Sequence, residues 1–210
     1  MNLADLLIAN GSRVESSMRM SPRERRLAAD YRSISQLLSE STILQADAKG
    51  NPPQHYRFRF HGWGVGLDAR GNVVALETHE VIIELGAAYP RLMPTLIWQT
   101  PIFHPNISSN GIVCLGGYGT HWVPSLTLSE LCTMLWDMIR YKNYNNDSPY
   151  NREAALWART QTQFGFPLDL RPLRNRVAGQ LPRASALNQG NSVEDTAVQK
   201  RPPAEIVFLD

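Results

Sequence analysis

Two residues of this chain can act as sulfur nucleophiles, Cys114 and Cys132, and their surroundings differ. Cys132 lies in a run whose apolar residues repeat at helical spacing, where a cysteine behaves as a small buried hydrophobic side chain. Cys114 lies between the turn-forming pairs Asn110-Gly111 and Gly116-Gly117. Such a segment leaves a thiol accessible, which nucleophilic use requires. Cys114 is therefore the candidate nucleophile, although an accessible cysteine taken alone is more often incidental than catalytic.

The other residues that carry chemistry do not complete a metal site or a peptidase site. The two cysteines are eighteen positions apart and the histidines are scattered, so we expect no metal ion and no cofactor. A cysteine peptidase needs a histidine base beside the thiol. The candidates, His104 and His121, show no peptidase signature around Cys114. A cysteine peptidase is therefore the less favoured enzyme class.

The clearest element that could position these residues is a helix that begins after Ser21. Ser21 suits the N-cap and Pro22 the first helical position, and Glu24 can reach back to complete a capping box. Apolar residues at helical spacing give this helix one buried stripe, formed by Leu27, Tyr31, Ile34 and Leu38. Arginines cluster on the same helix, at positions Arg23, Arg25 and Arg26. This cluster is either a solvated face or a surface that binds a partner.

Residues 43–98 change to the pattern of short strands and turns. Alternation of apolar and polar residues predicts a strand over 56–60, and apolar runs predict others over 81–83 and 95–98. The segments 51–53 and 70–72 carry the proline, glycine and asparagine residues of turns. These connections are too short for helical crossovers, so a four-stranded antiparallel meander is expected.

Two further helices are predicted after the meander. Thr127 and Glu130 form a second capping box, and good helix formers cover residues 152–163. The order of elements predicts an α+β domain: an N-terminal helix, the antiparallel meander, a loop with Cys114, and C-terminal helices. We place this domain at residues 21–167, after a flexible lead-in over 1–20. Residues 168–210 lose periodicity and are expected to form a C-terminal extension, partly disordered.

Composition narrows the choice of partners and location. A hydrophobic content of 43% in 210 residues supports a real core. The net charge of +2 is too small to favour nucleic acid or an anionic membrane as the main partner. No apolar run approaches the ~18 residues of a membrane span. Because the chain has only two cysteines and does not need a disulfide, a reducing cytoplasm is the expected location.

A set of residues between positions 89 and 151 stands at a characteristic spacing. The set is Tyr89-Pro90, Pro94, Thr100, Ile102, His104-Pro105-Asn106-Ile107, Gly111, Cys114, Leu115, Trp122, Pro124, Leu126, Thr127, Asp147 and Pro149. Cys114 follows Asn106 by eight positions and precedes Trp122 by eight. In these features the segment resembles the catalytic core of ubiquitin-conjugating enzymes. So many positions in register carry far more weight than a single tripeptide.

The resemblance implies a reaction and roles for the site residues. Cys114 would accept a ubiquitin-like protein as a thioester from an activating enzyme and pass it to an acceptor nucleophile, a lysine amine. Asn106 would stabilise the oxyanion with its side-chain amide, although it could equally serve as a turn residue. The resemblance gives His104, Pro105 and Trp122 the task of supporting the active-site loop. Asp147 or Ser148 would orient the incoming amine, or both would belong to a Ser-Pro turn before the last helix.

The resemblance also implies protein partners. The family's first helix meets the activating enzyme, so Arg23, Arg25 and Arg26 are candidate contacts. Pro124 lies in a loop close to the family's form, whereas Arg91 stands where ligase-dependent relatives place an aromatic residue. We therefore expect transfer that is unaided or that uses a dedicated ligase, in the setting of a bacterial conjugation operon. The alternative within this fold is a non-catalytic variant that binds a ubiquitin-like protein, but such variants lack the cysteine.

Overall fold

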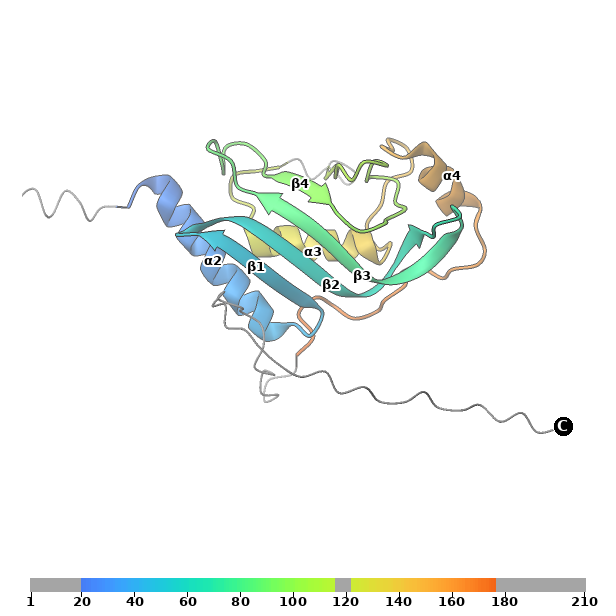
Figure 1. Ribbon diagram of the computed structural model, residues 1–210, viewed down its shortest axis with the longest axis horizontal. Helices are drawn as coiled ribbons and strands as arrows, with labels where there is room; N and C mark the ends of the chain where they lie inside the picture. Colours follow the sequence, from blue (N-terminus) through green and yellow to red (C-terminus); the bar gives the residue numbers. More distant parts are fainter. Residues whose placement is uncertain (1–19, 116–121, 177–210) are drawn as a thin grey trace, which may run out of the picture.

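The computed structural model describes residues 20–115 and 122–176 (Figure 1). The predictions for residues 1–19 of the lead-in and for residues 177–210 of the extension lie outside the described residues. So do the glycines at 116, 117 and 119, and His121.

The secondary structure follows the predicted order of one helix, a strand meander and two helices. The elements are α2 (Pro22–Glu40), β1 (Leu44–Gly50), β2 (Pro53–Leu67), β3 (Val73–Glu84), β4 (Thr95–Trp98), α3 (Leu128–Ile139) and α4 (Arg152–Thr160). The strands form a single antiparallel sheet in the order β1-β2-β3-β4. The predicted α+β class and the four-stranded meander are therefore confirmed. The last helix ends at Thr160, three residues before the predicted end at 163.

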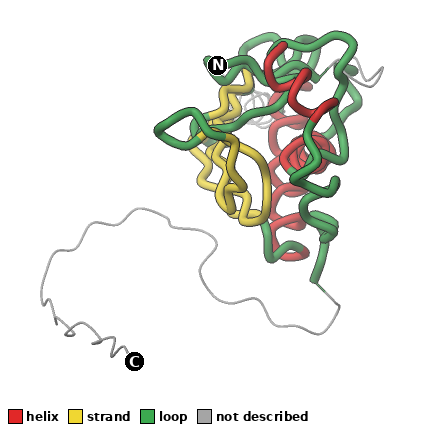
Figure 2. The backbone as a smooth tube through the Cα atoms, turned by 90° about the vertical axis from the view of Figure 1, so that its right-hand side faces the viewer, coloured by secondary structure: helices red, strands yellow, loops and turns green. Residues whose placement is uncertain are grey.

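The sheet forms one layer and the helices α2 and α3 cover one of its faces (Figures 1 and 2). The alternation of β2 explains this arrangement, because Tyr56, Phe58 and Phe60 are buried while Arg57 and Arg59 point to the other face. The helices contribute the facing half of the core, which includes Leu27, Ile34, Leu37, Leu131, Leu135 and Trp136. The core thus lies between the sheet and these two helices.

Both predicted capping boxes are present. At α2, the hydroxyl of Ser21 accepts from the backbone N–H of Glu24, and Glu24 accepts from the backbone N–H of Ser21. Thr127 and Glu130 make the same pair of bonds at the start of α3. Each N-cap is worth about 1 kcal/mol of stability, so the local sequence sets where both helices begin.

A second, smaller core holds the segment between α3 and α4. Aromatic rings dominate it: Phe103, Tyr141, Tyr144, Trp157 and Phe166. The ring of Tyr141 stacks on that of Phe166 with centroids 4.5 Å apart, and its hydroxyl donates to the backbone oxygen of Phe103. The loop after β4 and the start of α4 are therefore fixed to each other.

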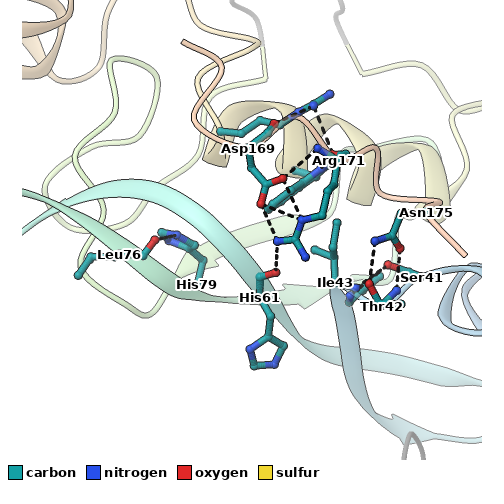
Figure 3. Close-up of polar contacts among 12 residues, drawn as sticks. Ser41, Thr42, Ile43, His61, Leu76, His79, Asp169, Arg171 and Asn175 are labelled. Carbon is teal, nitrogen blue, oxygen red and sulfur yellow. Dashed lines mark hydrogen bonds and ion pairs between the residues drawn. The ribbon is translucent and has the colours of Figure 1, made fainter. Parts of the chain in front are cut away.

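Residues 168–176 carry no regular secondary structure, yet they pack on the domain (Figure 3). The guanidinium of Arg171 pairs with Asp169 at 2.6 Å and donates to the backbone oxygen of His61 at 3.2 Å. The indole N–H of Trp136 donates to the backbone oxygen of Arg171 at 2.9 Å. Leu173 is 2% exposed and belongs to the main core. The packed domain therefore continues past the predicted boundary at residue 167, through Arg176. The rest of the predicted extension lies outside the described residues.

Candidate active site

The loop that follows β4 carries Cys114 and is held by its own backbone. The backbone N–H of Trp98 donates to the oxygen of Gly111 at 2.8 Å, and that of Cys114 donates to the oxygen of Asn106 at 2.9 Å. Gly111 has a φ of 80° and its missing Cβ would lie 2.5 Å from the oxygen of Trp98, so only glycine fits there. These bonds fix Cys114 directly against the segment that contains His104 and Asn106.

The two cysteines differ as the sequence predicts. Both are free thiols, but Cys132 is completely buried whereas Cys114 is partly exposed. Burial raises the pKa of the Cys132 thiol far above its usual range. Cys132 is therefore protonated and inaccessible, which leaves Cys114 as the thiol that another protein can reach.

His104 shapes the loop and is not placed to act as a base. The side chain is fully buried, and its Nδ1 accepts from the backbone N–H of Asn106 at 3.1 Å. Because Nδ1 accepts, Nε2 carries the proton and donates to the backbone oxygen of Asn143 at 3.3 Å. Burial lowers the pKa of His104 to about 3, so the ring is neutral at physiological pH. Both ring nitrogens are thus used inside the protein.

Asn106 is almost completely buried, and its side-chain amide is bonded at both ends. Its Oδ1 accepts from the backbone N–H of Asn145 at 2.7 Å, and its Nδ2 donates to the backbone oxygen of Asn145 at 3.1 Å. An amide nitrogen has two N–H groups, so one remains for another acceptor. Asn106 can therefore hold the loop and offer a hydrogen bond at the same time.

Asp147 and Ser148 both lie at the exposed surface of the segment before α4. The carboxylate of Asp147, whose side chain is 92% exposed, pairs with the guanidinium of Arg159 at 2.7 Å. Among the described residues, neither Asp147 nor Ser148 makes a hydrogen bond to Cys114. Both residues thus stand near the other site residues in the sequence, but neither is hydrogen-bonded to the thiol in the described part of the chain.

Tyr150, which the sequence analysis did not single out, is bound to the same loop as Cys114. Interaction with the Cys114 side chain raises the pKa of Tyr150 above its ordinary value. Its backbone N–H donates to the oxygen of Pro105 at 2.8 Å. The available signal in the sequence was a hydroxyl-bearing side chain next to Pro149, two positions after Ser148. Only the fold, however, shows that this position is bound to the loop that carries Cys114.

Trp122 supports a loop that lies between the first helix and the Tyr89-Pro90 pair. Its indole N–H donates to the backbone oxygen of Pro90 at 2.8 Å, and its ring lies 5.8 Å from that of Tyr89. Pro124 is exposed in the same loop, next to the exposed Val123. Arg91 is also exposed and is followed by Leu92 and Met93, which are 65% and 42% exposed.

The three clustered arginines near the start of α2 do not form one free basic face. The guanidinium of Arg26 pairs with the buried carboxylate of Asp30 at 2.8 Å and donates to the hydroxyl of Tyr89 and to the backbone oxygens of Pro124 and Leu126. Arg23 donates to Gln54, and to the backbone oxygens of Leu85 and Gly86. Arg25, in contrast, is exposed, and within residues 20–115 and 122–176 its side chain bonds only to the backbone oxygen of Met20.

The described residues offer neither a metal site nor a membrane span. Over residues 20–115 and 122–176, no three histidine, cysteine or acidic side chains gather as metal ligands. Within the same ranges, none of the helices has the length and apolar content needed to cross a bilayer.

Comparison with known proteins decides the family. The family model described as ubiquitin-conjugating enzyme matches residues 33–166, which contain Asn106, Cys114 and Tyr150. The chain belongs to the ubiquitin-conjugating enzyme family. This membership confirms the resemblance that the sequence analysis stated.

Relatives and a solved structure agree with this membership. The chain is 39% identical to ubiquitin-conjugating enzyme E2 16 of Schizosaccharomyces pombe over 79 residues, which are 37% of this chain and 48% of the relative. It is 32% identical to probable ubiquitin-conjugating enzyme E2 17 of Arabidopsis thaliana over 95 residues, which are 42% and 59% of the two chains. The matches thus span about half of each relative. The fold is similar to that of S. cerevisiae Ubc12, with a TM-score of 0.54, 22% identity, and coverage of 78% of this chain and 86% of that chain.

Proposed function

We propose that this ubiquitin-conjugating family member is an acyl transferase that carries a ubiquitin-like protein as a thioester on Cys114. The observation that supports this most is the position of Cys114: a partly exposed thiol, bonded through its backbone to Asn106, inside the segment that matches the family. A non-catalytic variant of the fold has no need of such a thiol.

The reaction has two acyl transfers. In loading, the Cys114 thiolate attacks the carbonyl carbon of a thioester between the modifier and its activating enzyme, and that enzyme's cysteine leaves as a thiolate. In discharge, an acceptor amine attacks the new thioester, the bond to Cys114 sulfur breaks, and the amine loses a proton to solvent or a nearby base. The acceptor is proposed to be a lysine, and no cofactor takes part.

Asn106 is proposed to stabilise the oxyanion of the discharge step. The geometry supports this because the amide has one N–H beyond the single N–H that it donates to Asn145. A donor of this kind typically contributes about 2.7–4 kcal/mol of transition-state stabilisation. His104 and Pro105 serve this function indirectly: His104 binds the backbone of Asn106 and Asn143, and Pro105 accepts from Tyr150 and Asn151.

Asp147 and Ser148 are proposed to face the incoming amine. Asp147 keeps a carboxylate at the surface although it is paired with Arg159, because both side chains are largely exposed and such a pair is weak. Next to this segment lies an open groove of about 770 Å³, lined by Trp98, Phe103 and Tyr150 among others. The acceptor protein is proposed to contact this groove, whose described lining includes Tyr150 but not Cys114.

The proposed partners are a ubiquitin-like modifier and its activating enzyme. We propose that they act in the cytoplasm and are encoded with this chain in a bacterial conjugation operon. Within the cluster Arg23, Arg25 and Arg26, Arg25 is the arginine that can meet an acidic surface, because Arg23 and Arg26 are used within the fold. At Arg91, a hydrated guanidinium replaces the aromatic anchor that often dominates a small interface. We therefore propose that transfer is unaided or uses a dedicated ligase.

The test is a charging reaction followed by intact-protein mass spectrometry. The first probe pair is ubiquitin with a ubiquitin-activating enzyme, and the second is any ubiquitin-like protein and activating enzyme encoded beside this gene. With ATP, we expect the mass of one modifier to be added through a bond that excess thiol cleaves, and conjugates to form with no ligase present. Trimming of the modifier without ATP would instead identify a cysteine peptidase.

A further inference from the structure

The segment that contains Cys114 presents alternate side chains to solvent. Gly111, Val113 and Leu115 are buried, whereas Ile112 is 49% exposed and Cys114 is partly exposed. Because successive side chains of an extended segment point to opposite sides, Ile112 lies on the same side as the thiol. Two residues of strand span about 7 Å, so an exposed apolar side chain stands next to the reactive sulfur.

Ile112 is the last of three isoleucines in a row on the outer face of the sheet, which is the face opposite α2 and α3 (Figure 2). Ile82 of β3 lies opposite Ile97 of β4 in the antiparallel register, and Ile97 forms an isolated bridge with Ile112. Side chains directly opposite one another have Cβ atoms about 4.5–5.5 Å apart. Since Ile97 is 40% exposed and Ile82 is partly exposed, the three side chains form one continuous apolar surface, the isoleucine strip.

Hydrogen bonds hold the backbone beneath the isoleucine strip. The N–H of Ile112 donates to the hydroxyl of Ser108 at 3.0 Å, and the oxygen of Ile112 accepts from the N–H of Ser108 at 3.0 Å. The N–H of Trp98, next to Ile97, donates to the oxygen of Gly111 at 2.8 Å. A surface that is fixed in advance loses little conformational entropy when a partner binds.

The isoleucine strip is too small to hold a free partner. At its β3 end, Ile82 lies opposite Arg57, whose guanidinium pairs with Glu80 at 3.4 Å, so the apolar surface stops there. A stable interface between separate proteins buries about 800 Å² and involves about 20–30 residues on each side. Three isoleucines fall well below this size, which argues against a second copy of this chain or a free acceptor protein as the occupant.

A protein that is already joined to Cys114 is not subject to this limit. Its binding to the isoleucine strip is intramolecular, and a short flexible tether gives an effective concentration in the mM range. Contacts too weak to capture a free partner are then sufficient. The size of the strip and its position beside the thiol therefore favour the carried protein as the occupant.

The helix that lies against the thiol offers less apolar surface than the isoleucine strip. Met134 and Met138 of α3 line one small cavity with Cys114. Met138 is buried, however, and the residues of α3 that are fully exposed are Glu130 and Thr133, which are polar. An apolar patch on a carried protein would therefore find its complement on the strip and not on α3.

We propose that the isoleucine strip binds the ubiquitin-like protein while that protein is carried on Cys114. The inference rests on the proposed function and names the surface that holds the carried protein. The occupant is a modifier with an apolar patch within reach of its own C-terminal tail. Contact with the strip restricts the orientations of the thioester, which raises the rate at which an acceptor amine attacks it.

The test uses a conjugate that forms without an activating enzyme or ATP. Ubiquitin whose last residue is replaced by cysteine is joined to Cys114 by a disulfide, which takes the place of the thioester. Cys132 is completely buried and stays reduced. NMR spectra of this chain, labelled at its isoleucine methyl groups, follow Ile97 and Ile112 before and after the disulfide is reduced. A short peptide with the same tail sequence, joined in the same way, controls for effects of the disulfide itself.

We expect the methyl signals of Ile97 and Ile112 to shift in the ubiquitin conjugate beyond their shifts in the peptide conjugate, and to return on reduction. Free ubiquitin at the same concentration should leave them in place, because the contact needs the tether. Signals that are the same in the ubiquitin and peptide conjugates overturn the proposal. Signals that shift with the concentration of this chain alone also overturn it, because they identify a second copy as the occupant.

Substitutions test the effect of the isoleucine strip on transfer. The double variant Ile97→Thr/Ile112→Thr removes apolar surface and keeps β-branched residues on the sheet. We expect its pre-formed Cys114 thioester to discharge to free lysine about two- to tenfold more slowly, the effect of losing a small apolar contact. Leu170→Thr is the matched control, because Leu170 is 83% exposed on the C-terminal segment, and it should discharge at the wild-type rate. Thermal unfolding checks that all variants keep the fold.

The outcomes separate this proposal from its alternatives. If the double variant slowed transfer to a protein acceptor but not to free lysine, the acceptor would be the occupant and the proposal would be overturned. Methyl shifts in the ubiquitin conjugate of a protein that never charges would support the isoleucine strip as a binding surface and refute the proposed function. Normal charging with methyl signals that match the peptide conjugate would refute the role of the strip alone.

Discussion

The side chain of Asn106 and the backbone of Asn145 exchange two hydrogen bonds, with lengths of 2.7 and 3.1 Å. These bonds join the loop that carries Cys114 to the segment that carries Asp147, Ser148 and Tyr150. The residue proposed to stabilise the oxyanion therefore also sets the position of that segment. Substitutions at Asn106 must be expected to change both structure and chemistry.

Asn106→Ala should leave loading close to normal and slow discharge to free lysine by about 10²–10³, the usual cost of a lost oxyanion donor. It should also lower the free energy of unfolding by about 1–3 kcal/mol, because the backbone N–H and oxygen of Asn145 lose their partners. Single-turnover discharge and chemical denaturation measure the two effects.

Asn145→Ala is the control for loop distortion in this comparison. It removes the side-chain oxygen that accepts the N–H of Asp147 at 2.7 Å and keeps the Asn106 amide. We expect discharge to slow less than tenfold, since one ordinary loop hydrogen bond is lost. If Asn106→Ala discharged at the wild-type rate, Asn106 would have a purely structural role.

The arginines of α2 should separate into structural and binding residues. Arg26→Glu should lower the free energy of unfolding by about 3 kcal/mol, because it leaves the buried carboxylate of Asp30 without its cation and adds a like charge. Arg25→Glu should keep stability and slow charging by the activating enzyme at low ionic strength, since exposed complementary charge acts on association and is screened by salt.

Arg32→Glu provides the control for net charge, because Arg32 is exposed on the same helix, farther from its N-terminus. Charging rates at low and high salt, together with thermal unfolding, distinguish the three variants. If Arg25→Glu charged as fast as the wild type at every salt concentration, Arg25 would be an ordinary solvated residue.

Local signals in the sequence predict the fold well because they act over a few residues. The capping boxes at Ser21 and Thr127 and the alternation around Phe58 each involve neighbours in the chain. The family pattern likewise singles out Cys114 as the candidate nucleophile without knowledge of the fold.

The features that the sequence analysis missed all join residues far apart in the chain. Arg26 belongs to an arginine cluster in the sequence, but its partners Tyr89 and Leu126 lie on two distant loops. Tyr150 and Cys114 are held at one loop because both donate to the backbone oxygens of residues 105 and 106. Residues 168–176 show no periodicity, since hydrogen bonds to specific backbone groups and one buried leucine hold them instead of a helix or strand.

The segment 168–176 should be required for stability. Leu173→Ala should lower the free energy of unfolding by about 2–5 kcal/mol, because it deletes a fully buried side chain of the main core. Leu170→Ala is the matched control, because Leu170 is 83% exposed, and it should change stability by less than about 0.5 kcal/mol. Denaturant titrations test both. If both substitutions lowered the free energy of unfolding by the same small amount, the segment would be only loosely packed on the domain.

Two buried histidines should make the protein sensitive to mild acid. Burial lowers the pKa of His79 to about 4 and that of His104 to about 3. As pH falls below about 6.5, the unfolded chain binds protons on both rings while the folded protein does not, so the free energy of unfolding falls with pH. When the unfolded chain binds two more protons than the folded protein, the free energy of unfolding changes by up to about 2.7 kcal/mol per pH unit, between roughly pH 4 and 6.

His79→Gln should reduce this slope by about half, whatever its effect on stability at pH 7. His55→Gln is the control, because His55 lies exposed on the sheet with 61% of its side chain accessible. Urea titrations at several pH values supply the slopes. A stability that stays constant from pH 7 to pH 5 would show that neither ring is kept neutral by burial.

Thioester formation on Cys114 is the claim on which the other proposals depend. The most direct measurement compares Cys114→Ser and Cys132→Ser in the same charging reaction, with intact mass read before and after excess thiol. We predict that Cys132→Ser still gains one modifier through a thiol-cleavable bond, even if burial makes the protein less stable. Cys114→Ser should gain either no modifier or one held by a thiol-resistant ester. Loss of charging in a folded Cys132→Ser protein, with thiol-cleavable charging retained in Cys114→Ser, would contradict the account.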